Sequence, residues 1–231
     1  MLGRLLRRLV GLPLASLKAK MADPVFFAVC PPATVKGMTQ LDRDAFRTVV
    51  KVPYFEVAAE SSNSALSAVR SYLLKLPWFK PVQDSGVRKM FVLNPALVQR
   101  IEDMSQNARN TLEHCGVTSL EVRELPLHYD NWTAEMVLRA VLGQPDAAGY
   151  SIVGHIVHLN LRPHLEPFKH LIGQVYLDKV KNVICVMNKV NTIESEYRTF
   201  RMELLAGEAK TQVSVKENGA RLVFPCYSFL S

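Results

Sequence analysis

Glycine is sparse and evenly spread in this 231-residue sequence, and no two of its eleven glycines lie closer than five positions apart. The sequence therefore contains no Gly-x-Gly turn. Folds that bind nucleotides or related donors through a glycine-rich turn need it after the first strand, because the backbone must approach the ligand without a Cβ in the way. A binding turn of this kind is excluded.

Cysteine pairs and long apolar runs are also missing. The four cysteines are scattered and form no Cys-x-x-Cys pair, so we interpret them as buried or incidental thiols in a reducing compartment: Cys30, Cys115, Cys185 and Cys226. No apolar run approaches the roughly 18 residues that span a bilayer. We therefore expect no membrane-spanning segment.

Familiar metal and catalytic motifs are absent as well. His155 and His158 are three positions apart on a predicted strand and would point to opposite faces, and no acid or second cysteine lies at zinc spacing. Structural or surface histidines are favoured, and we expect no metal. The sequence has neither a serine nucleophile elbow nor a His-Glu-x-x-His motif.

Positive charge is present but concentrated at one end. The net charge is +7, yet residues 1–20 hold five basic side chains and no acid, which leaves +2 for the rest. Leucines and a valine there follow the spacing of one helical face. Such a segment is typical of a mitochondrial transit peptide, and a basic surface helix or a disordered tail is the alternative. We predict a mitochondrial matrix protein with a further cytoplasmic and nuclear pool.

The region after residue 20 predicts an α+β fold with two domains. Residues 21–40 are an irregular lead-in with several prolines, and 41–142 form a small α+β domain. Its expected strands are 48–57, 89–93 and 120–125, and its expected helices are 61–74, 97–114 and 133–142.

A linker rich in glycine, proline and aspartate follows at 143–150. Residues 151–231 predict a β-rich domain with one packed helix. The expected strands are 151–161, 182–190, 197–205, 212–215 and 221–224, with the helix at 166–177 and a hairpin turn at 217–219.

Basic and aromatic residues alternate along this second domain. Arginine next to aromatic rings suits base stacking and phosphate binding, although a surface strand with core aromatics gives the same pattern. The residues are Arg162, Lys169, Lys189, Tyr197, Arg198, Phe200 and Arg201. Glu194, Glu196 and Glu203 favour a solvated salt-bridging face over a catalytic carboxylate pair.

Several blocks of this sequence resemble the tRNA (guanine-37-N1)-methyltransferase family of the eukaryotic and archaeal type. They are 154–162 (GHIVHLNLR), 167–175 (PFKHLIGQV), 197–208 (YRTFRMELLAGE) and 215–219 (VKENG), in the family's order and spacing. Residues 37–46 (GMTQLDRDAF), followed by Val52 and Pro53, resemble the start of its N-terminal domain.

The resemblance implies an enzyme that transfers a methyl group from S-adenosylmethionine to N1 of the guanine 3′ of the anticodon. It also implies a tRNA-docking domain, a domain that shapes the target pocket, and a Rossmann-like donor domain. Only the first two are expected here, so we expect a truncated monomeric form that binds tRNA, binds no donor by itself and is inactive alone. A non-catalytic tRNA-binding module is the alternative.

The resemblance also suggests site residues. The reaction requires an extruded guanine, loss of its N1 proton and stabilisation of charge at O6. Aligned with the family's arginine-containing strand, Arg198 is the candidate catalytic residue for the O6 contact, and a salt bridge to Glu196 or Glu203 is the alternative. The candidate tRNA-binding residues, which could also be ordinary surface charges, are Arg162, Lys169, Lys189 and Arg201.

Overall fold

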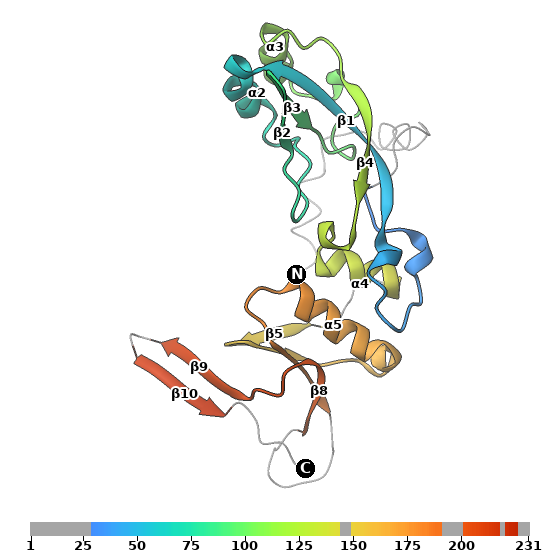
Figure 1. Ribbon diagram of the computed structural model, residues 1–231, viewed down its shortest axis with the longest axis vertical. Coiled ribbons are helices and arrows are strands. Elements are labelled where there is room, and N and C mark those ends of the chain that lie inside the picture. The colour runs from blue at the N-terminus through green and yellow to red at the C-terminus, as the bar shows by residue number, and fades with distance from the viewer. Residues whose placement is uncertain (1–28, 144–148, 191–200, 218–219, 226–231) are drawn as a thin grey trace, which may run out of the picture. The chain divides into compact units, whose positions relative to one another are not determined.

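The computed structural model describes residues 29–143, 149–190, 201–217 and 220–225, without the side chains of Arg201 and of residues from 213 on (Figure 1). Its packing divides the chain into two compact units. The main part of the first is Val49–Pro126, and the second combines Cys30–Thr48 with Leu127–Ser231. The predicted mixed α+β class is confirmed.

The first unit is built on a four-stranded sheet in the order β2-β3-β1-β4. The central strand β3 pairs antiparallel with both β1 and β2. The expected strands are present with small shifts, whereas β2 is short and lacks an alternating pattern that would predict it. The bounds are β1 Thr48–Ala58, β2 Val82–Ser85, β3 Arg88–Val92 and β4 Glu121–Leu127.

Helices α2 (Ser62–Val69) and α3 (Gln106–His114) pack on each other and are shorter than predicted. The helix expected at 97–114 begins only at 106, because the Ser105 hydroxyl accepts the Ala108 amide (3.3 Å) as its cap. A 3₁₀ turn (Ile101–Asp103) precedes it. The helix expected at 61–74 ends early because Leu73 pairs with Leu93 beside the sheet.

The core of the first unit joins these helices to the sheet. Phe55 of β1 stacks on Phe91 of β3 with ring centroids 5.0 Å apart. The helices contribute buried apolar side chains to the same cluster, among them Val69 and Leu112. Burial of these side chains is the main source of stability for this unit.

The second unit contains a four-stranded sheet in the order β5-β6-β7-β8. β5 and β6 form an antiparallel hairpin, β6 and β7 are parallel, and β7 and β8 are antiparallel. The single strand predicted at 151–161 is therefore wrong, because the chain turns at Gly154 (φ 58°). The bounds are β5 Tyr150–Val153, β6 Ile156–Leu159, β7 Cys185–Val190 and β8 Arg201–Gly207.

Helix α5 (Lys169–Lys179) forms the crossover between the parallel strands β6 and β7 and packs on β7 and β8. A 3₁₀ helix (Pro163–Phe168) leads into it. A separate two-stranded antiparallel sheet consists of β9 (Gln212–Glu217) and β10 (Ala220–Pro225), close to the predicted strands. The expected turn includes residues 218 and 219, which lie outside the described residues.

Helix α4 (Ala134–Leu142) packs on α5 within the second unit. Its predicted start and stop are confirmed: the Thr133 hydroxyl accepts the Met136 amide (3.2 Å), and Gly143 closes the helix at φ 70°. The buried Trp132 indole donates to the Phe46 carbonyl (3.1 Å). The compact units therefore divide at other positions than the linker expected at 143–150, and the expected domain limits stay a prediction.

Among the described helices, none is long and apolar enough to cross a membrane. Within the same residues, no group of three or more His, Cys, Asp or Glu side chains is placed to hold a metal ion.

Candidate functional site

The carboxyl ends of β6 and β7 meet at one edge of the second unit's sheet, because the two strands are parallel. Arg162 follows the end of β6, Lys189 is the next-to-last residue of β7, and Lys169 opens α5. In open α/β sheets, ligands bind outside the carboxyl ends of the strands. We call this region, with the first residue of β8, the β6–β7 edge.

Strand β8 returns to the same edge, since Arg201 pairs with Val190 at the end of β7. All four predicted tRNA-binding residues therefore lie at the β6–β7 edge by their backbone positions. Arg198, together with Tyr197 and Phe200, lies outside the described residues. The described residues on either side of the segment that carries Arg198, Val190 and Arg201, are paired with each other.

Asn188 fixes the geometry of this edge. It is the buried polar residue of the described core (4% exposed), and its side-chain oxygen accepts the Leu161 amide at 3.0 Å. This bond ties the segment that follows β6 to β7 and so holds the backbone next to Arg162. Sequence reasoning missed Asn188, although a single amide within the apolar run of β7 was an available signal.

Lys169 has carboxylate partners at this edge. Its ammonium lies 2.6 Å from Glu166 and 2.8 Å from Glu203. Its hydrogen bonds, first to Glu166 and then to Glu203, raise the pKa of Lys169. A phosphate at this position would compete with two carboxylates, so Lys169 is placed to fix α5 against β8.

The other predicted residues differ in exposure. Arg162 is exposed, and in the described part of the chain no carboxylate forms an ion pair with it. Lys189 is half-buried. The structure describes the backbone of Arg201 but not its side chain. Arg162 is therefore the most accessible described cation of the β6–β7 edge.

The two histidines considered for a metal site occupy different environments. His155 lies in the turn between β5 and β6, where its Nε2 is 3.0 Å from the Lys210 carbonyl oxygen. His158 lies on β6, and burial lowers the pKa of its imidazole. The expectation that both lie on one strand is wrong, because the hairpin separates them.

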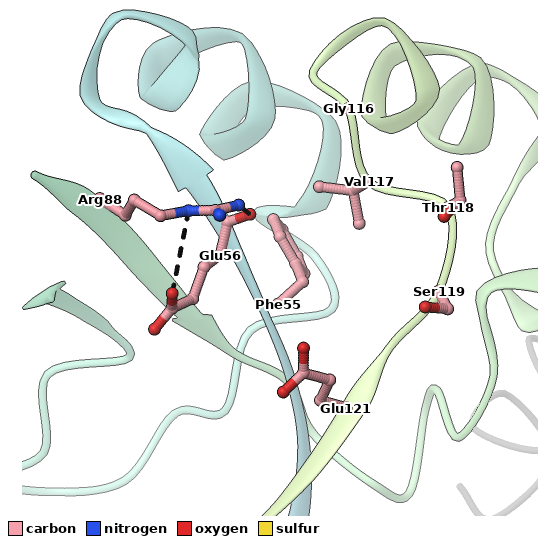
Figure 2. Close-up of a pocket in the computed structure, with 8 residues that line it drawn as sticks. All are labelled: Phe55, Glu56, Arg88, Gly116, Val117, Thr118, Ser119 and Glu121. Atoms are coloured by element: carbon pink, nitrogen blue, oxygen red, sulfur yellow. Dashed lines mark hydrogen bonds and ion pairs between the residues drawn. The ribbon is translucent and has the colours of Figure 1, made fainter.

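A small cleft of about 160 Å³ lies in the first unit (Figure 2). Arg88 crosses it and donates to the Glu56 carbonyl (2.8 Å), while its Nε lies 3.8 Å from the Glu56 carboxylate. The Tyr54 hydroxyl donates to Glu121 beside it, and this bond raises the pKa of Tyr54. None of the basic residues predicted from the sequence lines this cleft.

The topology and the site define the class of protein: a mixed α+β protein whose second unit gathers basic residues outside a parallel strand pair. Residues 135–211, which include the β6–β7 edge, match the family model described as the TYW2 N-terminal domain.

Curated relatives with one name match most of this chain. The chain is 43% identical over 199 residues to a tRNA (guanine(37)-N(1))-methyltransferase of Anopheles darlingi. The aligned region covers 84% of this chain and 39% of the relative. The enzyme of the same name from Danio rerio is 38% identical over 208 residues (84% and 43%). The resemblance is confirmed: the chain is a relative of the tRNA (guanine(37)-N(1))-methyltransferase family. It spans about two fifths of the length of these relatives.

Solved structures show a looser likeness. A chain of "The complex structure of aTrm5 and tRNALeu" matches with a TM-score of 0.49 and 16% identity, over 78% of this chain and 53% of that chain. Trm5b from Pyrococcus abyssi matches with a TM-score of 0.45 and 20% identity, over 76% and 48%. The likeness to these methyltransferases therefore depends on the sequence relatives.

Proposed function

We propose that this chain is the tRNA-binding part of a tRNA (guanine(37)-N(1))-methyltransferase, which methylates N1 of the guanine 3′ of the anticodon. The observation that carries the proposal is the 38–43% identity to two enzymes of that name over about 200 residues. The basic residues at the β6–β7 edge support it, since phosphate contacts position a protein on nucleic acid.

The β6–β7 edge has a defined part in this proposal. The target guanine is extruded toward it, and Arg198 stabilises the charge that develops at O6 once the N1 proton leaves. Both ends of the segment that carries Arg198, Val190 and Arg201, are paired at this edge. Arg162 and Lys189 contact the tRNA backbone, and Lys169 holds α5 in place.

S-adenosylmethionine supplies the methyl group in the proposed reaction, and the described residues do not fit it. A Cβ on Gly173 would meet Leu205 at 2.6 Å, and one on Gly207 would meet the Ile184 carbonyl oxygen at 2.2 Å. These glycines permit close packing within the unit and leave no cradle for a ligand. We therefore derive no step through the donor and propose that the chain alone transfers no methyl group.

Binding and activity assays on the purified chain test this function. We expect filter binding to show tRNA bound more tightly than an unstructured RNA of equal length, with affinity that falls as salt rises. We expect no transfer of labelled methyl groups, and transfer once the chain is joined to a relative's donor-binding segment. Equal affinity for both RNAs would contradict the proposal.

The second candidate function is a non-catalytic tRNA-binding module. The observation that favours it is that the 231 residues contain no glycine-rich turn. The joined protein separates the two candidates. If it binds tRNA with the affinity of the chain and still transfers no methyl group, the module is favoured.

A further inference from the structure

The segment that joins α2 to β2 presents an exposed tryptophan. Trp78 is 89% exposed, whereas the chain's other tryptophan, Trp132, is fully buried. An indole is a large apolar group that proteins usually bury at least in part. Because the Trp78 side chain is exposed, the folded state lacks the hydrophobic stabilisation that its burial would provide.

The backbone at Trp78 is unusual as well. The Phe79 amide donates to the Leu76 carbonyl (3.4 Å), so residues 76–79 form a β-turn. Pro77 takes its second position and Trp78 its third, with φ at 53°. A turn with proline followed by a left-handed residue is of type II, which favours glycine or asparagine at that third position. A bulky residue there is strained, and such strain gathers at binding sites.

The sequence neighbours of Trp78 carry positive charge. Residues 61–83 contain no Asp or Glu, and Lys75 and Lys80 flank the turn with exposed side chains. In the described part of the chain, no carboxylate lies within ion-pair distance of either lysine. Asp84, the next acid along the chain, is paired with Lys89 at 2.7 Å. Along the chain, Trp78 therefore lies between two exposed cations that can meet an anionic partner. The hydrogen bond from Lys89 lowers the pKa of Asp84, and the charge of Lys80 also helps to lower it.

We propose that Trp78 is a base-stacking residue for tRNA, with Lys75 and Lys80 on the flanking phosphates. This inference rests on the proposed function and deepens it by assigning a contact in the first unit. A base offers a flat face to an aromatic ring whatever its sequence, and the phosphates on either side match the two ammonium groups. A protein partner would instead favour a wider apolar patch with little charge at its centre.

Tryptophan fluorescence of the full chain tests the contact directly. Acrylamide should quench Trp78 and spare the buried Trp132, and a tRNA transcript should protect Trp78 from quenching. In Trp78→Phe the emission should come from Trp132 and should not respond to tRNA. Trp78→Ala should weaken tRNA binding about 10- to 100-fold, whereas Trp78→Phe should retain most of the affinity.

Two further variants separate binding from folding. Glycine suits a φ of 53°, so Trp78→Gly should leave the melting temperature unchanged or higher while it weakens tRNA binding as much as Trp78→Ala. Val87 is 88% exposed in the same unit and serves as the matched control. Val87→Ala should change neither stability nor tRNA affinity.

The outcomes distinguish this inference from the proposed function. A wild-type chain with no preference for tRNA would contradict the proposed function. Wild-type binding with equal affinity in Trp78→Ala and Trp78→Gly would overturn the stacking role alone. A marked drop in melting temperature in Trp78→Gly would also overturn it, because the indole would then be structural. Protection of Trp78 that grows with protein concentration without tRNA would assign it to a protein contact instead.

Discussion

At the residue scale, Tyr129 shows how charge is stabilised within the second unit. The Lys179 ammonium lies 3.7 Å from the centre of its ring, and the Arg43 guanidinium lies 5.7 Å away. The Tyr129 hydroxyl donates to Asp178 (3.1 Å), which also accepts from Arg43. Burial raises the pKa of Tyr129 and lowers that of Lys179. These contacts join residues 30–48 to the end of α5.

Arg198 carries the prediction about chemistry, which must be measured in the chain joined to a relative's donor-binding segment. If Arg198 contacts O6 as charge develops, Arg198→Ala should lower kcat by about 10²- to 10³-fold and weaken tRNA binding much less. Arg198→Lys should rescue poorly, since an ammonium lacks the planar fork of a guanidinium. If Arg198→Ala has a normal kcat and a free energy of unfolding changed by about 1 kcal/mol or less, Arg198 forms a surface ion pair and has no catalytic role.

Tyr176 gives a prediction about pH. Burial raises the pKa of this hydroxyl to about 12, from an ordinary value of 10. The folded state therefore holds a proton that the unfolded chain releases, so stability is intact below pH 10 and falls between pH 10 and 12. Urea unfolding of the second unit should show this loss, and Tyr176→Phe should reduce its slope. An unchanged slope would mean that Tyr176 does not contribute.

At the scale of elements, α5 determines the β6–β7 edge. It connects the two parallel strands, begins with Lys169 and packs closely on β8. Its close approach depends on Gly173, because a Cβ there would lie 2.6 Å from the Leu205 Cβ and 3.2 Å from the Leu205 carbonyl carbon. A glycine within a helix is unfavourable by about 1 kcal/mol relative to alanine, so packing outweighs propensity here.

Gly173→Ala should destabilise the second unit. The added methyl must displace β8 or α5, because it would lie 2.6 Å from the Leu205 Cβ. Overpacking costs about 1–3 kcal/mol, and so close a contact places the cost in the upper part of that range, above the roughly 1 kcal/mol gained in helix propensity. Urea unfolding followed by circular dichroism measures the difference. Gly149→Ala is the control, since a Cβ at Gly149 meets nothing within 4 Å. A more stable Gly173→Ala variant would show that the two elements separate easily.

At the scale of the whole molecule, the two units divide the proposed work. The second unit holds the β6–β7 edge, and its residues 135–211 match a family model. The first unit presents Trp78 and the small cleft beside Arg88. A tRNA is long enough to contact separate units of one protein, so variants in each unit should weaken binding independently when their effects are combined.

Targeting by residues 1–20 is a prediction about the whole chain. Fused to a fluorescent reporter, these residues should direct it to mitochondria, because they form an acid-free amphipathic pattern with arginines. A version of the full chain that starts at Met21 should remain in the cytosol or nucleus. The same distribution for both starting points would rule out a transit peptide.

Local signals in the sequence predicted much of the fold. Helix α4 could be predicted because Thr133 and Gly143 cap it, and β7 because its residues form an apolar run. The sequence blocks 154–162, 167–175, 197–208 and 215–219 also indicated the resemblance to the tRNA (guanine(37)-N(1))-methyltransferases. The errors occurred where a local pattern is compatible with two structures. The apolar residues of 151–161 fit either one long strand or a hairpin, and only the pairing of β5 with β6 places a turn at Gly154.

Tertiary structure alone decided which distant residues meet. Nothing in the sequence indicated that Lys169 binds Glu203, that the partner of Asn188 is the Leu161 amide, or that Trp78 is exposed while Trp132 is buried. Caps and periodicity act over a few residues and can therefore be recognised in the sequence. Contacts between distant segments depend on how whole elements pack. The free energy of that packing comes from several segments together, so no single stretch of sequence reveals it.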